Sequence, residues 1–187
     1  MRKSSILFVT TLSTLSTLGV GLLGPVYPIF IINRFSASAV DLGVLYAIFC
    51  FTTAIFKVLS GKLVDSLGKS QVFFVGVAIG AVCSLSYIFA VDIIQLYLIE
   101  FFYGLSYALQ RPALLTLMFD ASNTCNRGFF LGMFESIYDL TEAFAAVFSV
   151  IIVSKFGFEP LFLMCSGCQA TTGILILKAE NKFFLKR

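Results

Sequence analysis

Long apolar runs alternate with short polar connections along the whole chain. Each run reaches the length of about 20 residues that an α-helix needs to cross the hydrocarbon core of a bilayer. The pattern therefore predicts about six membrane-spanning helices, at roughly 6–32, 40–60, 71–90, 93–119, 129–153 and 160–177. The first run contains no small-residue cleavage site, so we interpret it as an uncleaved span and not as a signal peptide.

The composition narrows the class of protein further. Of the 187 residues, 59% are hydrophobic and only 12% are charged, whereas soluble domains carry about 25% charged residues. Six spans fill this length, so we predict a single membrane domain over residues 1–187. The composition excludes a disordered chain, a nucleic-acid-binding protein and a disulfide-framed secreted module. Because the chain has no His, it has no His-ligated zinc site and no His general base. We predict no metal, no cofactor and no enzymatic activity.

The basic residues lie mostly on one side of the predicted membrane. Nine Lys and Arg residues fall in the termini or in connections on the same side as the termini, and two fall on the other side. Basic residues in short loops mark the cytoplasmic side, so we predict a cell-membrane protein with both termini in the cytoplasm. The formal charge of +3 is then a topology signal and not a sign of a nucleic-acid partner. The nine are Arg2, Lys3, Lys62, Lys69, Arg127, Lys178, Lys182, Lys186 and Arg187, and the two are Arg34 and Lys155.

The connection between the second and third spans reads Gly61-Lys-Leu-Val-Asp65-Ser-Leu-Gly68-Lys69. Gly68 can adopt the positive φ of a tight reversal, and Asp65 can cap the next helix or pair with Arg127 on the same side. This segment resembles the signature G-x-L-a-D-r-x-G-r of the major facilitator superfamily, which occupies the same connection. We predict that Asp65 and Arg127 form a contact of a cytoplasmic gate, to which Gly61, Gly68 and Lys69 also belong.

The resemblance implies an all-α membrane protein, a six-transmembrane-helix bundle of two inverted three-helix repeats that is half of a major facilitator fold. The repeats cover about residues 1–90 and 91–187. It also implies a secondary active transporter, or half-transporter, that moves a small polar solute by alternating access, with proton symport as one form of coupling. Three positions depart from the family: Glu100 replaces an Arg, Ser66 replaces a base, and Asp139–Ala146 replaces a Gly-Pro motif. The last departure disfavours a drug/proton antiporter.

Ionisable side chains inside the predicted spans are costly and therefore indicate function. At about 100° per residue, the acids of the fifth span lie on one helical face: Glu135, Asp139 and Glu142. The fourth span has a similar polar face: Glu100, Tyr103, Tyr107 and Arg111. We predict that Arg111 pairs with Glu135 or Asp139, which either fastens the helices or forms part of a transport site. Because these acids outnumber the base, at least one stays unpaired, and all three are candidates for proton coupling.

The first span adds a face rich in hydroxyl groups, and we expect the substrate cavity to lie between spans one, four and five. Its predicted lining comprises Thr14, Thr17, Tyr103, Tyr107 and Arg111. The chemistry of the solute stays open, because Arg111 can hold an anion, the acids a cation and the tyrosine rings a sugar. Gly76 and Gly80 are expected to allow close helix packing, and Lys57 is expected to extend toward the cytoplasmic interface.

A single bundle of six spans leaves its polar faces against lipid, where no water satisfies them. We therefore expect a homodimer about a two-fold axis, or pairing with a separate second six-span half. The alternative function is a non-transporting assembly or regulatory membrane protein that retains the half-transporter fold. The half length and the altered motifs of the fourth and fifth spans favour this alternative.

Overall fold

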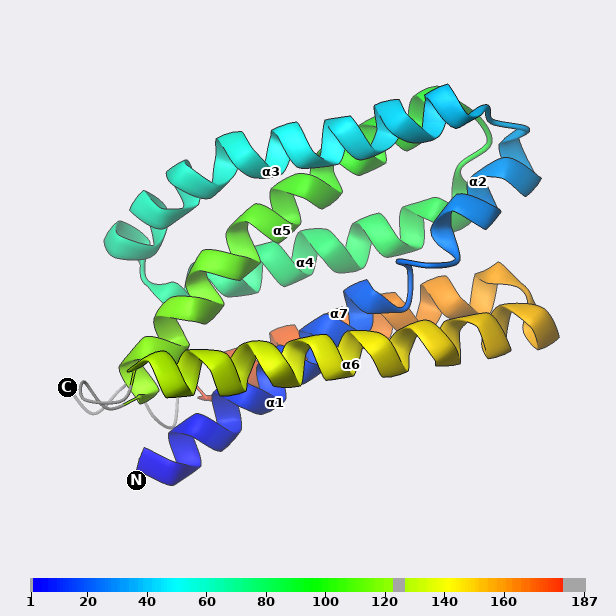
Figure 1. The fold of residues 1–187 in the computed structure, drawn as a ribbon. Coiled ribbons are helices and arrows are strands. Elements are labelled where there is room, and N and C mark those ends of the chain that lie inside the picture. The colour runs from blue at the N-terminus through cyan, green and yellow to red at the C-terminus, as the bar shows by residue number, and fades with distance from the viewer. Residues whose placement is uncertain (1, 123–126, 180–187) are drawn as a thin grey trace.

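Seven α-helices and no strand form the part of the chain that the computed structural model describes, residues 2–122 and 127–179 (Figure 1). The helices are α1 (Arg2–Gly21), α2 (Tyr27–Phe35), α3 (Ala39–Leu67), α4 (Lys69–Phe89), α5 (Ile93–Ala121), α6 (Arg127–Phe156) and α7 (Phe158–Ala179). Among them, α3, α4, α6 and α7 are long and apolar enough to cross a membrane. α5 matches α3 in length at 29 residues, but polar side chains such as Glu100 and Gln110 lower its hydropathy. The helical class predicted from the sequence is confirmed for these residues.

The first predicted span, 6–32, is two helices and not one. α1 ends at Gly21, the backbone turns over residues 22–26, and α2 begins at Tyr27 with Pro28 in its first turn. Pro25 and Pro28 have no backbone N–H to donate, and the Gly24-Pro25 pair cannot continue a regular helix. Our prediction of a single helix over this span is therefore wrong, and the break turns α2 away from the axis of α1 (Figure 1).

The turn between α3 and α4 is tighter than the sequence indicated. α3 continues to Leu67, so Gly61 and Asp65, which we expected in a connection, are helical. Gly68 alone separates the two helices and has φ +97°, a conformation that favours glycine. The predicted role of Gly68 in the reversal is thus confirmed.

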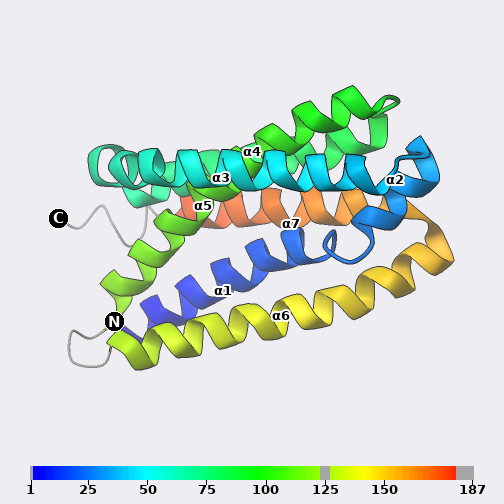
Figure 2. The same ribbon diagram turned by 45° about the horizontal axis from the view of Figure 1, so that its top comes forward.

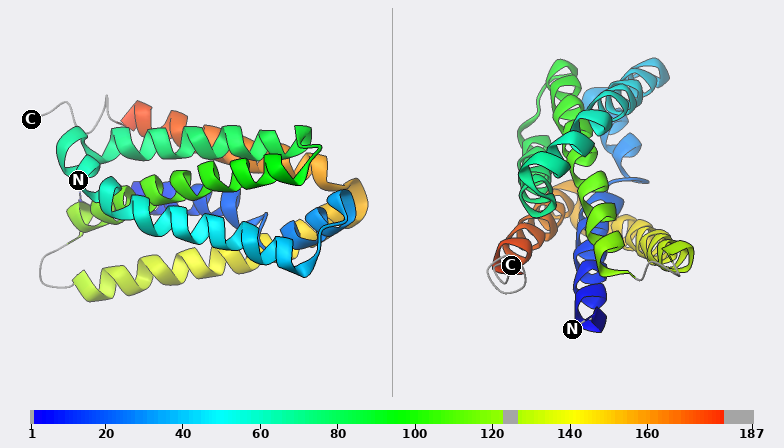
Figure 3. Two further views of the ribbon diagram at one scale, coloured as in Figure 1. Left: turned by 90° about the horizontal axis from the view of Figure 1, so that it is seen from above. Right: turned by 90° about the vertical axis from the view of Figure 1, so that its left-hand side faces the viewer.

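α5 runs through the middle of the bundle and packs chiefly against α3 and α4, while α4 also packs against α7 (Figure 1). α1 contacts α5, α6 and α7. α6 lies at one edge and contacts mainly α1 (Figures 2 and 3). α1 begins and α7 ends at the same end of the bundle as the α3–α4 turn (Figure 1). We call this the inner end and the opposite end, where α2 lies, the outer end.

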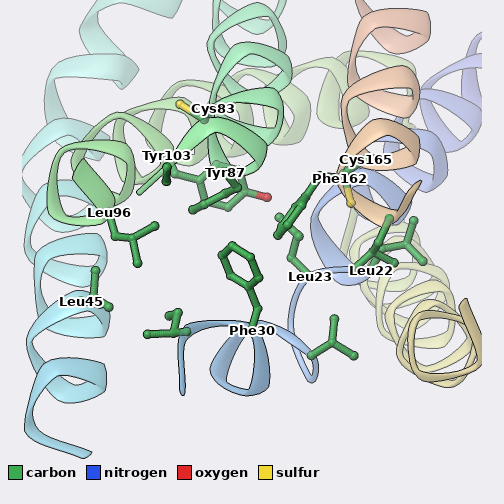
Figure 4. Packing of buried hydrophobic residues seen from close by; sticks show 14 of the residues in the cluster. Leu22, Leu23, Phe30, Leu45, Cys83, Tyr87, Leu96, Tyr103, Phe162 and Cys165 are labelled. Atoms are coloured by element: carbon green, nitrogen blue, oxygen red, sulfur yellow. The ribbon is translucent and has the colours of Figure 1, made fainter. Parts of the chain in front are cut away.

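An aromatic core fixes α2 to the outer end of the bundle. Phe30 of α2 is 1% exposed and points toward Tyr87 of α4 and Phe162 of α7 (Figure 4). The Phe30 and Phe162 ring centroids are 4.8 Å apart, and those of Tyr87 and Phe162 are 5.4 Å apart. Rings at these separations attract one another beyond the gain from their burial alone. The segment after the break is therefore held by packing, although it is short.

Two glycines bring α4 close to α5. A Cβ atom at Gly76 would lie 2.8 Å from Gln110 Cγ, and one at Gly80 would lie 2.8 Å from Ser106 Oγ. The Ser106 hydroxyl donates a hydrogen bond to the Gly76 carbonyl at 2.8 Å. The prediction that Gly76 and Gly80 permit close packing is confirmed, and the polar contact adds to the packing as it does in membrane helix pairs.

Candidate functional site

A cavity of about 410 Å³ lies at the outer end, between the α1–α2 break, α3, α4 and α5. A volume of roughly 300–1,000 Å³ is typical of pockets for small molecules. Its polar lining consists of one carboxyl group and four phenols: Glu100, Tyr27, Tyr46, Tyr87 and Tyr103. The remaining lining is aliphatic or aromatic, so the cavity has an apolar wall with a few convergent polar groups.

Glu100 is the one charged side chain among the described residues that line this cavity. It is 5% exposed, and the Tyr87 hydroxyl donates a hydrogen bond to its Oε1 at 2.6 Å. The Tyr27 hydroxyl also lies beside this carboxyl. Within the described residues no Lys or Arg nitrogen lies within 4.0 Å of the Glu100 oxygens. A buried carboxyl without a cationic partner is costly, so its presence indicates a function other than packing.

Tyr87 stands at the centre of the aromatic part of the site. Its ring centroid is 5.4 Å from that of Tyr27 and 6.2 Å from that of Tyr103, both in edge-to-face geometry. Figure 4 shows Tyr87 and Tyr103 side by side near Cys83. The Tyr103 side chain is buried, and its hydroxyl has no hydrogen-bond partner. The Tyr27 hydroxyl likewise has no hydrogen-bond partner, so the site contains one hydrogen-bonded carboxyl group and two buried hydroxyl groups without a partner.

The local sequence explains how Tyr87 meets Glu100. α4 ends at Phe89 and α5 begins at Ile93, so the two helices form a hairpin with a very short turn. The Gln95 side chain accepts a hydrogen bond from the Val91 backbone N–H at 2.9 Å across this turn. Tyr87 lies in the last turn of α4 and Glu100 about two turns into α5, and the close packing of the two helices brings their side chains together.

A second polar group of residues lies farther along α5, toward the inner end. Arg111 forms an ion pair with Glu135 of α6, and its guanidinium carbon lies 4.4 Å from the ring centroid of Tyr138. The predicted pairing of Arg111 with Glu135 is therefore present. The adjoining cavity, lined by Thr17 and Tyr107 among others, has a volume of only about 20 Å³. This space is close to the volume that one water molecule needs, about 10–15 Å³.

The predicted substrate residues do not share one cavity. Tyr103 lines the large outer cavity, whereas Thr17, Tyr107 and Arg111 line the small one. The Thr14 hydroxyl donates to the Thr10 carbonyl of its own helix at 2.9 Å. The structure thus divides the polar face that we expected to be continuous.

Lys57 departs from its predicted direction. Its Nζ atom lies 5.2 Å from the ring centroid of Tyr107. Tyr107 is more than three helical turns from the inner end of α5, so the ammonium group does not extend to that end. The attraction between a cation and an aromatic face favours this position.

The remaining acids of α6 lie at the edge of the bundle. Asp139 and Glu142 are both exposed, and within the described residues neither forms an ion pair. The backbone of Glu142 nevertheless packs on α1, because a Cβ atom at Gly21 would lie 3.4 Å from its Cα. Their part in proton coupling stays a prediction.

At the inner end, an ion pair joins Lys69, the first residue of α4, to Asp120 in the last turn of α5. Asp65 and Arg127 are both exposed, and no ion pair between them occurs in the described residues. The predicted contact of the gate is thus absent from this structure, and Lys69 pairs with an acid that the sequence analysis did not consider. A Cβ atom at Gly61 would meet nothing within 4 Å.

Sequence reasoning missed the centre of the outer site. Glu100 was noted as a departure from a family pattern and as a member of the Tyr103 face, but not as a site residue. The available signal was that Glu100 is an acid within a predicted span and has no basic residue one helical turn away. Tyr27 and Tyr87 carried no signal of their own, because their role depends on the break after α1 and on the α4–α5 hairpin.

Four helices that are long and apolar enough to cross a membrane, with many apolar side chains exposed on the bundle, are typical of a multi-pass membrane protein. Residues 9–182 match the model of the Major Facilitator Superfamily, and the chain belongs to this family. It is 30% identical over 125 residues to the niacin transporter of Acinetobacter baylyi, which covers 67% of this chain and 28% of that protein. The fold resembles that of the POT family transporter PepTSo with a TM-score of 0.78, at 14% identity, over 96% of this chain and 38% of the other. The chain therefore spans less than half the length of these two relatives.

Proposed function

We propose that the protein is a secondary active transporter, or half of one, that moves a small polar solute across the cell membrane by alternating access. The observation that carries this proposal is the 410 Å³ cavity with the buried Glu100 inside a helical bundle of this family. Transporters built from repeated helical units bind their solutes deep in the membrane, between those units. A cavity lined by residues of α1 to α5, with a buried carboxyl group in an otherwise largely apolar wall, suits that role.

The same proposal includes the topology. α1 and α2 together count as the first span, α3 to α7 as the other five, and α1–α4 and α5–α7 form two inverted repeats of three spans. The side that holds most Lys and Arg residues is the cytoplasmic side, so the inner end faces the cytoplasm. Gly61, Asp65, Gly68, Lys69 and Arg127 then belong to a gate at that end. The Lys69–Asp120 ion pair supports a closed inner end, because it ties α4 to α5 there.

We expect transport to depend on a proton gradient through Asp139 or Glu142, since Glu135 is already paired with Arg111. Asp139→Asn and Glu142→Gln are expected to abolish gradient-driven uptake but to spare exchange of solute between the two sides, because exchange needs no net proton movement. The measurement is uptake of labelled anionic, neutral and cationic solutes, nicotinate among them, into vesicles with and without a pH gradient. The niacin transporter relative makes nicotinate a reasonable first solute.

Glu159→Gln is the matched control, because Glu159 is exposed and lies in the first turn of α7. Unchanged dependence on the gradient in both α6 variants would exclude proton coupling through these acids. Absence of flux for every solute class, together with a stable complex with another membrane protein, would favour the assembly or regulatory function instead.

We further propose that another bundle covers α3 and α6 in the membrane. α6 contacts little besides α1, and it exposes the carboxylates of Asp139 and Glu142. Lys57 is exposed on α3. Lipid cannot satisfy such groups, so a second copy of the chain or a second six-span half is expected against them.

Cross-linking is expected to show this contact. A Cys introduced at Asp139, in a background from which the exposed Cys50 has been removed, should cross-link across the interface, and native mass measurement in mild detergent should give the mass of the assembly. The control is a Cys at the exposed Val82 of α4, on a helix that packs between α5 and α7. A folded, strictly monomeric and active protein, or an assembly joined through α4 and α7, would contradict the proposal.

A further inference from the structure

The charge of the outer cavity limits what it can hold. Glu100 is the one charged group in its described lining, and no cationic partner for it occurs among the residues that the structure describes. Among the other charged residues at the same end, Arg34 and Asp41 are engaged elsewhere. Arg34 donates to the Ile88 carbonyl at 3.0 Å, and Asp41 accepts from the Ser38 backbone N–H at 2.8 Å. The cavity therefore has an uncompensated carboxyl group and no base.

Aromatic rings form much of the remaining lining. Tyr27, Phe49, Tyr87 and Tyr103 all lie around the carboxyl, and the Phe49 and Tyr103 centroids are 6.1 Å apart. The faces of such rings attract alkylammonium and other organic cations, most strongly when water is excluded. The buried Tyr103 hydroxyl has no partner and can hydrogen-bond a ligand.

We propose that the outer cavity binds a monovalent organic cation, with Glu100 as its counter-ion and the tyrosine rings around its apolar part. This inference rests on the proposed transport function and names its class of substrate. An organic anion fits poorly, because the nearest base of α5, Arg111, belongs to the small cavity and is paired with Glu135. A metal ion fits poorly as well, since the described residues contain no group of three or more His, Cys, Asp or Glu side chains. A site that binds only a proton would not require a cavity of about 410 Å³.

Three compounds with one pyridine ring and three different charges test the proposal. The N-methylnicotinamide cation, neutral nicotinamide and the nicotinate anion are each measured by equilibrium binding of the labelled compound to the purified protein in lipid nanodiscs. We expect the cation to bind about tenfold more tightly than nicotinamide, a difference of about 1.4 kcal/mol, and nicotinate to bind most weakly. Tighter binding of nicotinate than of the cation would overturn the proposal. Absence of detectable binding of the cation at about 10 mM would overturn it as well.

Glu100→Gln is the decisive variant. Its amide oxygen can still accept the hydrogen bond from Tyr87, so packing is preserved while the charge is removed. We expect the cation and nicotinamide to bind equally to this variant, and we expect Glu100→Asp and the exposed control Glu159→Gln to keep the preference for the cation. A preference that persists in Glu100→Gln would overturn the proposal. If that variant does not fold, the order of the three compounds on the unaltered protein decides alone.

The same measurements separate this inference from the transport function. Preferential binding of the cation without flux in vesicles would contradict only the proposed transport. Flux of nicotinate together with stronger nicotinate binding would support transport and contradict the cation site.

Discussion

Replacing Gly104 with alanine is expected to destabilise the folded protein by about 2 kcal/mol, because extra atoms in a tight interface force the backbone apart. A Cβ atom at Gly104 of α5 would lie 2.8 Å from the Phe49 carbonyl oxygen and 3.1 Å from Thr52 Cβ, both on α3. A backbone oxygen cannot rotate away as a flexible side chain can. The substitution also weakens the hydrogen bond that Thr53 Oγ1 donates to the Gly104 carbonyl at 3.2 Å.

Gly43→Ala in α3 is the matched control. A Cβ atom there would meet nothing within 4 Å, and alanine is favoured over glycine in a helix by about 1 kcal/mol. The two substitutions are therefore expected to shift stability in opposite directions in a reversible unfolding titration in mixed micelles. Equal shifts would contradict the close contact between the backbones of α3 and α5 at Gly104. Because Phe49 lines the outer cavity, Gly104→Ala is also expected to weaken ligand binding there.

Glu135→Gln is expected to cost more stability than Arg111→Gln, although both remove the same ion pair. Arg111 is the more buried partner, with 16% of its side chain exposed against 37% for Glu135, and its buried Nη1 has no hydrogen-bond partner. A carboxylate left alone can be neutralised by a proton, whereas a guanidinium keeps its charge. We expect a loss of about 2–3 kcal/mol for Glu135→Gln, below the roughly 3–5 kcal/mol of a fully buried pair.

The double variant distinguishes a structural role from a functional one. Arg111→Gln with Glu135→Gln leaves no unpaired charge, so it is expected to be more stable than Glu135→Gln alone. Lys155→Gln, at the exposed end of α6, is the control and should leave stability within about 0.5 kcal/mol. Uptake that survives in the double variant would assign the pair to helix fastening, and loss of uptake in a stable double variant would place it in the transport cycle. A double variant less stable than Glu135→Gln would contradict the stated energetics.

Several features were predictable because they depend on neighbouring residues in the sequence. The apolar runs gave the helical membrane class, and five of the predicted spans each correspond to one helix from α3 to α7. Gly68 ends α3 with a positive φ, as its place in the signature indicated. The pairing of Arg111 with Glu135 was accessible as well, because adjacent antiparallel helices bring residues at similar depth together.

Other features were not predictable because they depend on which helix faces which. Helical periodicity identifies residues that share a face, but not the face that lies opposite. Thr17 and Tyr103 were expected in one cavity, and the packing of the bundle places them in two. Lys69 pairs with Asp120, a residue that is 51 positions away and that no local pattern connects with it.

Hydropathy and helical period are properties of short segments, so the apolar helices and the costly charges inside them could be predicted from the amino-acid sequence. The positions of those charges relative to one another depend on how the helices pack. The break at Gly24-Pro25 brings Tyr27 to Glu100, and the α4–α5 hairpin brings Tyr87 to the same carboxyl. These contacts join residues from three helices. Their geometry follows from the packing of the whole bundle, which no single segment contains.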